Sequence, residues 1–175
     1  MIHRILVATD GSEIADRAVD RAVELAARLA LPLRILCVVT DQPPGSALRD
    51  YAEAEHLGTR REPGAPVELP VAGYWSELQP GALAGAGRIS GVNLALSERF
   101  VDRAVRAARD AGVGAVEGRV LAGDPADVIL ADAAASGSDM IVLGSHGHGA
   151  VQGSLAGSVS QKVVHHARCS VLVVH

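Results

Sequence analysis

The sequence predicts a single α/β domain built on a doubly wound parallel sheet, with helices on both faces. Short apolar runs alternate along the chain with longer segments of helical periodicity, which is the pattern of consecutive βαβ units. Most of these runs lack polar alternation, as expected for parallel strands that are buried on both faces. With 175 residues, 49% of them hydrophobic, the chain is long enough for one substantial core.

The first unit is well defined by its apolar spacing. The run Ile5–Ala8 predicts a strand, and the helical spacing over residues 12–29 predicts the helix that follows it. Ser12 is suited to cap the start of this helix, and Pro32 limits its extension. Residues 33–39 form a second apolar run and predict a second strand.

The next unit repeats this order. Helical spacing predicts a helix over residues 94–111, and an apolar run predicts a third strand over residues 116–122. Asp124 is suited to cap the following helix, with Pro125 at its first position. Gly137 is suited to end that helix.

The last unit contains an unusual connection. Residues 140–143 predict a fourth strand, residues 159–167 a last helix and residues 170–174 a fifth strand. The strand and the helix are joined by GSHGHGAVQGSLAGS, residues 144–158, which holds five glycines. Glycine loses much conformational entropy on folding, so a simple connection is expected to use fewer.

One long region, at about residues 41–92, does not fit the alternating pattern. It contains most of the chain's eight prolines together with scattered glycines. Residues 47–57 are compatible with a short helix. So long a connection within a compact domain is either a functional segment or a disordered one. Two interpretations remain open, namely a mobile surface insertion and a lid or partner-binding arm, since Trp75 and both tyrosines lie in it.

Composition excludes several classes of function. The net charge is −4 with mixed signs, and aromatic residues make up 2% of the chain, so neither a nucleic-acid surface nor an anionic membrane is an expected partner. No run approaches the length of a membrane helix, and the apolar start is too short for a signal peptide. Cys37 and Cys169 lie in apolar contexts without metal-ligand spacing, which favours buried thiols in a reducing cytoplasm.

The glycine-rich loop is suited to hold a phosphate. In open parallel sheets, ligands bind beyond the carboxyl ends of the strands, where residues 9–12, the residues from Thr40 onward and residues 144–158 are expected to meet. The loop leads into a helix whose first amides lack partners and carry the positive end of the helix dipole. Neither the Walker pattern GxxxxGK[ST] nor the dinucleotide pattern GxGxxG occurs in the chain.

The loop instead contains Gly144-x2-Gly147-x9-Gly157-Ser158, and here the chain resembles the universal stress protein family. The ATP-binding members of that family carry G-x2-G-x9-G-(S/T) at this position. The stretches ILVATDGSE, LCVV, LAGDPADVI, IVLGSHG and CSVLVV also resemble family landmarks. The resemblance implies one domain over residues 1–175, with the insertion as its departure from the family pattern.

The resemblance implies five parallel strands in the order 3-2-1-4-5, with ATP across their carboxyl edge. It also implies that Asp10 lies near the phosphates or their magnesium ion, and the Asp10 carboxylate is a hard oxygen ligand of the kind that magnesium prefers. A homodimer through Ser170–Val174 is also implied, and this edge strand invites pairing on physical grounds. The expected nucleotide-binding residues are Ala8, Asp10, Val38, Leu143, Gly144, Ser145, His146, Gly147, His148, Gly149, Gly157, Ser158 and Val159.

Each of these residues also has a purely structural interpretation. Ser158 with Gln161 is a possible capping box, and Asp10 before Gly-Ser is suited to a turn. Val38 is equally a core residue. Three functions remain open, namely an ATP-dependent regulatory protein of the stress response, a slow ATPase, and a nucleotide-independent interaction module that uses the insertion at about 41–92. The first is our sequence-based hypothesis, with a cytoplasmic location.

Overall fold

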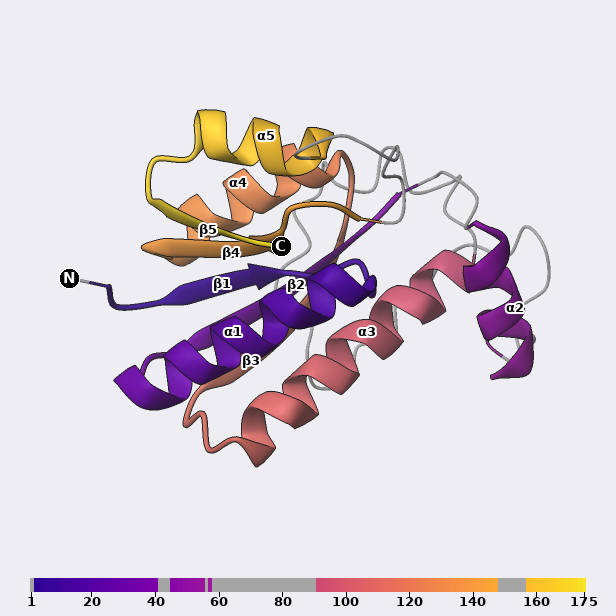
Figure 1. Cartoon of the computed structure of the whole chain (residues 1–175), viewed down its shortest axis with the longest axis horizontal. Helices are drawn as coiled ribbons and strands as arrows, with labels where there is room; N and C mark the ends of the chain where they lie inside the picture. Colours follow the sequence, from indigo (N-terminus) through magenta and orange to yellow (C-terminus); the bar gives the residue numbers. More distant parts are fainter. Residues whose placement is uncertain (1, 41–44, 56, 58–90, 148–156) are drawn as a thin grey trace.

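The computed structural model describes residues 2–40, 45–55, 57, 91–147 and 157–175 (Figure 1). The strands are β1 (Ile5–Ala8), β2 (Leu33–Val39), β3 (Val116–Ala122), β4 (Met140–Gly144) and β5 (Ser170–Val174). The helices are α1 (Glu13–Leu29), α2 (Ser46–Ala54), α3 (Gly91–Asp110), α4 (Pro125–Ser136) and α5 (Ser158–His166).

All five strands are parallel and lie in the order β3-β2-β1-β4-β5, which confirms the predicted topology. Helices α1 and α3 cover one face of the sheet, and α4 and α5 cover the other (Figure 1). In β2, Ile35 and Cys37 pack on the α1/α3 face while Leu36 packs on the α4/α5 face. Burial on both faces explains why the strands appear in the sequence as continuous apolar runs.

The helix ends follow the sequence signals closely. The Ser12 hydroxyl accepts from the Ala15 amide at 3.3 Å, and the Asp124 carboxylate accepts from the Asp127 amide at 3.2 Å. Gly137 ends α4 with a φ of 65°, in the left-handed conformation that glycine adopts readily. The predicted caps of α1 and α4 are therefore confirmed.

Some boundaries differ from the predictions. Helix α3 begins at Gly91 rather than at residue 94, so the last two residues of the predicted insertion are helical. The short helix predicted over residues 47–57 is α2, which ends three residues earlier. Most of the rest of the insertion lies outside the described residues. No described helix is long and apolar enough to cross a membrane.

The capping-box interpretation of Ser158 is wrong. Gly157 occupies the N-cap position of α5, and Ser158 is the first helical residue. The Gly157 carbonyl accepts the first intrahelical bond, from the Gln161 amide at 3.0 Å. Without a side chain at the N-cap, the start of α5 lacks a side-chain cap.

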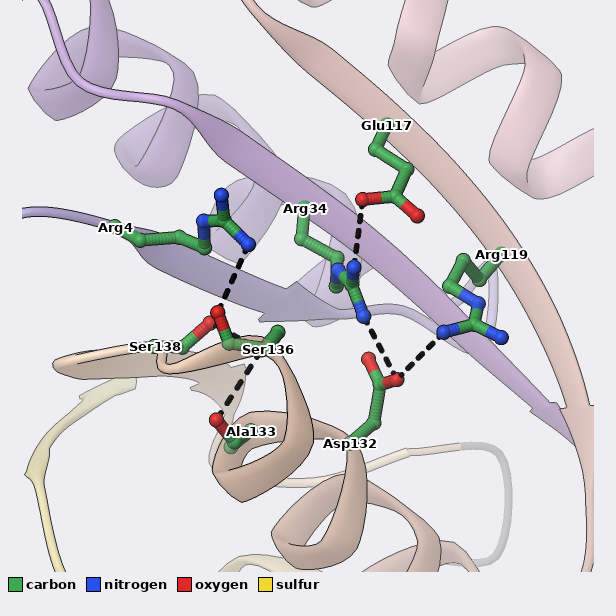
Figure 2. A network of polar contacts seen from close by, with 8 residues as sticks. All are labelled: Arg4, Arg34, Glu117, Arg119, Asp132, Ala133, Ser136 and Ser138. Atoms are coloured by element: carbon green, nitrogen blue, oxygen red, sulfur yellow. Dashed lines mark hydrogen bonds and ion pairs between the residues drawn. The ribbon is translucent and has the colours of Figure 1, made fainter. Parts of the chain in front are cut away.

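A buried ionic network fastens α4 to the edge of the sheet (Figure 2). The Asp132 carboxylate, on α4, accepts from Arg34 on β2 at 2.9 Å and from Arg119 on β3 at 3.2 Å. Arg34 also contacts Glu117 on β3 at 2.7 Å. Because the first turn of α4 lies at the carboxyl edge of the sheet, this network helps to set the position of residues there.

Candidate functional site

A cavity of about 590 Å³ lies at the carboxyl edge of the sheet, in the size range of small-molecule sites. Residues from the ends of β1, β2 and β4 and from the starts of α4 and α5 line it. The predicted residues His148 and Gly149 lie outside the described residues. The others all line the cavity, namely Ala8, Asp10, Val38, Leu143, Gly144, Ser145, His146, Gly147, Gly157, Ser158 and Val159.

The loop after β1 brings a carboxylate to the cavity. One carboxylate oxygen of Asp10, Oδ1, accepts from the Ser12 amide at 3.0 Å, so Asp10 does form the turn that its sequence context indicated. Gly11 within this turn has a φ of 78°. A Cβ on Gly147 would lie 2.2 Å from the other oxygen, Asp10 Oδ2. The second glycine of the motif therefore lets the two loops meet at the cavity.

The peptide of Ser145 holds together the two ends of the glycine-rich loop. Its carbonyl accepts from the Gly157 amide at 2.7 Å and from the Ser160 hydroxyl at 2.9 Å. Its amide donates to the carbonyl of Val174, the last residue of β5, at 2.7 Å. The start of α5 is thereby tied to the ends of β4 and β5.

The start of α5 differs from those of α1 and α4, which begin at the same edge. Ser12 and Asp124 satisfy amides at the starts of α1 and α4 with their own side chains. In α5, by contrast, the amides of Ser158 and Val159 have no partner among the described residues. Uncapped amides at the positive end of a helix dipole are a favourable site for an anion.

The charge around the cavity is acidic. Asp10 and Asp124 line it, and its described lining residues include no lysine or arginine. The amide of Asp127 and the ammonium group of Lys162 hold the pKa of the Asp124 carboxyl below its usual range, so this carboxyl is charged at neutral pH. Lys162 lies 3.1 Å from Asp124 and 2.7 Å from Asp127, so two carboxylates engage this one cation.

Sequence reasoning missed the wall of the cavity that α3 contributes. Asn93 and Ser97 line the cavity and are buried, with exposed fractions of 9% and 6%. The Asn93 amide group donates at 3.0 Å to the carbonyl of Thr40, the first residue after β2. Asn93 lies just before the helix predicted over residues 94–111, so only Ser97, a polar residue among the apolar positions of that helix, gave a signal in the sequence.

Cys37, on β2, is a buried thiol that also lines the cavity. Burial raises its pKa to about 12, the nearby Asp10 charge adds to this, and a hydrogen bond with Ser97 opposes it. We therefore expect Cys37 to resist an aromatic disulfide reagent at neutral pH in the native protein and to react once the protein is unfolded. Partial burial raises the pKa of Cys169 as well, so its thiol is expected to react slowly.

The raised pKa of Cys37 predicts a loss of stability at high pH. Above a pH of about 9, the unfolded chain gives up the Cys37 proton while the folded chain retains it up to about 12. The free energy of unfolding is therefore expected to fall as the pH rises through this window. Denaturant titrations at several pH values test this, with Cys37→Ala expected to lose this part of the dependence. Rapid labelling of Cys37 in the folded protein would contradict the prediction.

These features define a doubly wound α/β protein with a ligand cavity at the carboxyl edge of its sheet. The sequence profile of the universal stress protein family matches residues 1–175, and the chain belongs to this family.

Several relatives show the same likeness. A universal stress protein of Thermus aquaticus is 41% identical over 81 residues, which is 44% of this chain and 59% of that protein. The chain spans about half the length of the curated relatives that it matches. The structure of the universal stress protein UspA from Lactobacillus plantarum has a TM-score of 0.68 at 22% identity, with 99% of this chain and 98% of that chain covered.

A second solved structure is that of a universal stress protein in complex with cAMP. It has a TM-score of 0.62 at 26% identity, and the match covers 99% of this chain and 97% of that chain.

Proposed function

We propose that this chain is an ATP-binding regulatory protein of the stress response, in which nucleotide occupancy alters loop order or the choice of partner. The observation that carries the proposal is the uncapped start of α5, which opens onto the cavity between Gly144, Gly147 and Gly157. The cAMP complex of the related protein supports an adenine ligand for this family fold. We call the glycine-rich loop and the start of α5 the phosphate cradle, and we propose that they bind the phosphates of an adenine nucleotide.

We assign a different part of the nucleotide to each group of residues around the cavity. Ser158 and Val159 line the cavity, and their amides would donate to phosphate oxygens. The glycine-rich loop would contact the ribose and phosphates through Gly144, Ser145, His146, Gly147, His148 and Gly149. Ala8, Val38 and Leu143 would enclose the adenine, largely through their backbone groups, which explains why their side chains are simple aliphatic ones.

The residues at this edge also fit a magnesium ion that accompanies the nucleotide. Asp10 supplies a carboxylate, which is the kind of oxygen ligand that magnesium prefers. The described residues contain no cluster of three or more metal-ligating side chains. Phosphate oxygens and water would therefore complete the coordination, and the ion would neutralise charge on the phosphates.

We also propose a homodimer through β5. This strand pairs with β4 on one side and ends the strand order of the sheet. Its apolar residues Val171–Val174 are partly exposed, and a two-fold copy of the strand would bury both edges. A monomeric mass in light scattering at micromolar concentration would contradict this.

Calorimetric titration of magnesium and ATP tests the proposed function. The protein is first stripped of bound nucleotide, and Gly157→Val is titrated beside it. A Cβ at Gly157 would lie 3.3 Å from the Ser145 carbonyl oxygen, so the branched side chain is expected to displace the loop. We expect a loss of affinity of roughly tenfold or more, because the amide cradle is distorted.

Gly114→Val is the matched control. A Cβ there would have no neighbour within 4 Å, so the same substitution is expected to leave binding unchanged. Thermal unfolding of both variants separates loss of the cradle from loss of the fold. Failure of the parent protein to bind any adenine nucleotide at millimolar concentration would overturn the proposed function.

A further inference from the structure

The proposed function assigns no role to the wall of the cavity that α3 contributes. Four residues of this helix line the cavity, namely Asn93, Leu96, Ser97 and Phe100. Asn93 and Ser97 are polar, although they are buried among apolar positions of α3. Burial of a polar side chain is costly unless the side chain is hydrogen-bonded, so each of the two needs a partner.

Both residues find a partner at the carboxyl end of β2. Asn93 donates from its side-chain amide to the Thr40 carbonyl at 3.0 Å. Ser97, one turn further along α3, forms a hydrogen bond with the thiol of Cys37 on β2. The order of these pairs shows that α3 runs opposite to β2, so the two contacts fasten its first turns to the last residues of the strand. We call Asn93 and Ser97 the α3 clamp.

Val38 lies between the two clamped residues and lines the cavity. The carbonyl of Leu36 accepts from the Thr9 amide at 2.9 Å, so the backbone groups of Leu36 face β1. Alternate residues of a strand direct their backbone groups to the same neighbouring strand, so the amide and carbonyl of Val38 face this side as well. The pairing of β1 with β2 ends at Ala8 and Leu36. The backbone groups of Val38 therefore face the cavity beyond the end of β1.

An amide donor beside a carbonyl acceptor matches the edge of one kind of purine and opposes that of another. Adenine presents the N1 acceptor beside the 6-amino donor, whereas hypoxanthine and guanine present an N1–H donor beside a 6-oxo acceptor. A hydrogen bond weakens steeply as its angle departs from linearity. Discrimination between these bases therefore requires that the peptide groups of Val38 stay in place.

We propose that Asn93 and Ser97 are positioning residues for base selection, because they fix β2 against α3 on both sides of Val38. The clamp keeps the backbone groups of Val38 where they bind a 6-aminopurine and oppose a 6-oxopurine. The inference rests on the proposed function, because it concerns the selectivity of the same site. The clamp acts through β2, so its loss changes the preference between bases rather than the binding of the phosphates.

Titrations of ATP and of inosine triphosphate, each with magnesium, test the role of the clamp. The two nucleotides share their ribose and phosphates and differ only at the edge of the purine. We expect the parent protein to bind ATP roughly tenfold more tightly than inosine triphosphate, because the second nucleotide leaves polar groups unpaired.

Asn93→Asp keeps the shape of the side chain and replaces its donor by a carboxylate oxygen, which repels the Thr40 carbonyl. The ratio of the two affinities is expected to fall roughly threefold or more, mainly through weaker binding of ATP. Ser97→Ala removes the other contact without adding a charge, and we expect it to lower the ratio in the same direction. Asp102→Asn is the matched control, because it exchanges the same two side chains at an exposed position of α3 outside the cavity lining.

Thermal unfolding of the three variants confirms that the titrations compare folded proteins. If the ratio is unchanged in Asn93→Asp and Ser97→Ala, or if both nucleotides lose affinity equally, the clamp does not position the base. The inference is then wrong, while nucleotide binding stands. The same conclusion follows if the parent protein binds ATP and inosine triphosphate equally well. If the parent protein binds neither nucleotide, the proposed function itself is wrong, and the inference fails with it.

Discussion

Gly11→Ala is expected to lower the free energy of unfolding by about 3 kcal/mol, through left-handed backbone strain and overpacking together. Gly11 has a φ of 78°, which side chains other than glycine adopt at a cost. A Cβ there would lie 2.4 Å from the Cζ atom at the tip of the buried Phe100 ring. Urea unfolding of the variant measures the loss.

Gly112→Ala separates the two causes. Gly112 has a φ of 83°, but a Cβ there would have no neighbour within 4 Å. This variant is therefore expected to lose only about 1 kcal/mol, which is the cost of the backbone conformation. Equal losses in the two variants would show that the Phe100 ring moves aside easily.

Gly11→Ala is also expected to weaken nucleotide binding. Gly11 lies between Asp10 and the helix cap Ser12, and both Asp10 and Phe100 line the cavity. Displacement of the ring or the turn would therefore disturb both walls. Gly112 lies in the turn after α3 and outside the cavity lining, so Gly112→Ala is expected to bind nucleotide as the parent protein does.

Most of the fold could be predicted because its signals are local. The strands are continuous apolar runs, and three of the helix boundaries are marked by the residue that forms the cap, namely Ser12, Asp124 and Gly137. The sequence predicts the start of α5 one residue too late, because Ser158 has a better capping side chain than Gly157. The structure places Gly157 there instead, because its amide donates to the carbonyl of Ser145.

The candidate site could be predicted only in part, for a related reason. The glycine-rich loop and the loop that contains Asp10 can each be recognised from the composition of a few neighbouring residues. Asn93 and Ser97 reach the same cavity from a helix that follows a long insertion, and nothing near them in the sequence indicates where that helix packs. Their role depends on the contact of α3 with the ends of β2 and its following loop.

The buried ionic network is the clearest case of a feature set by distant partners. Arg34 interrupts an otherwise apolar strand, and Asp132 lies within a helix of mostly small and apolar residues. The two are 98 positions apart in the sequence. Only the packing of α4 over β2 shows that each residue is the counter-ion of the other.

This network carries the second large prediction. Asp132→Ala is expected to lower the free energy of unfolding by about 3 kcal/mol, because it removes the buried counter-ion of Arg34 and leaves only the more exposed Glu117 to pair with it. The Asp132 side chain is 3% exposed, and the Arg34 side chain is 10% exposed. Asp127→Ala, on the same helix, is the control. It breaks an exposed pair with Lys162 and is expected to cost less than about 1 kcal/mol.

A double substitution tests whether the ionic network makes the folded protein more stable than an apolar pair would, or whether only the removal of one partner is destabilising. Arg34 Nε and Asp132 Oδ2 are buried without a hydrogen-bond partner among the described residues, so the network leaves part of its desolvation cost uncompensated. Arg34→Met combined with Asp132→Leu is therefore expected to recover at least half of the stability that Asp132→Ala loses, because apolar side chains incur no such cost. Urea unfolding of the single and double variants provides the comparison. If the stability losses of the single variants simply add in the double variant, the pair contributes to stability through its charges. The position of α4, whose residues Asp124 and Ile129 line the cavity, would then depend on this ion pair.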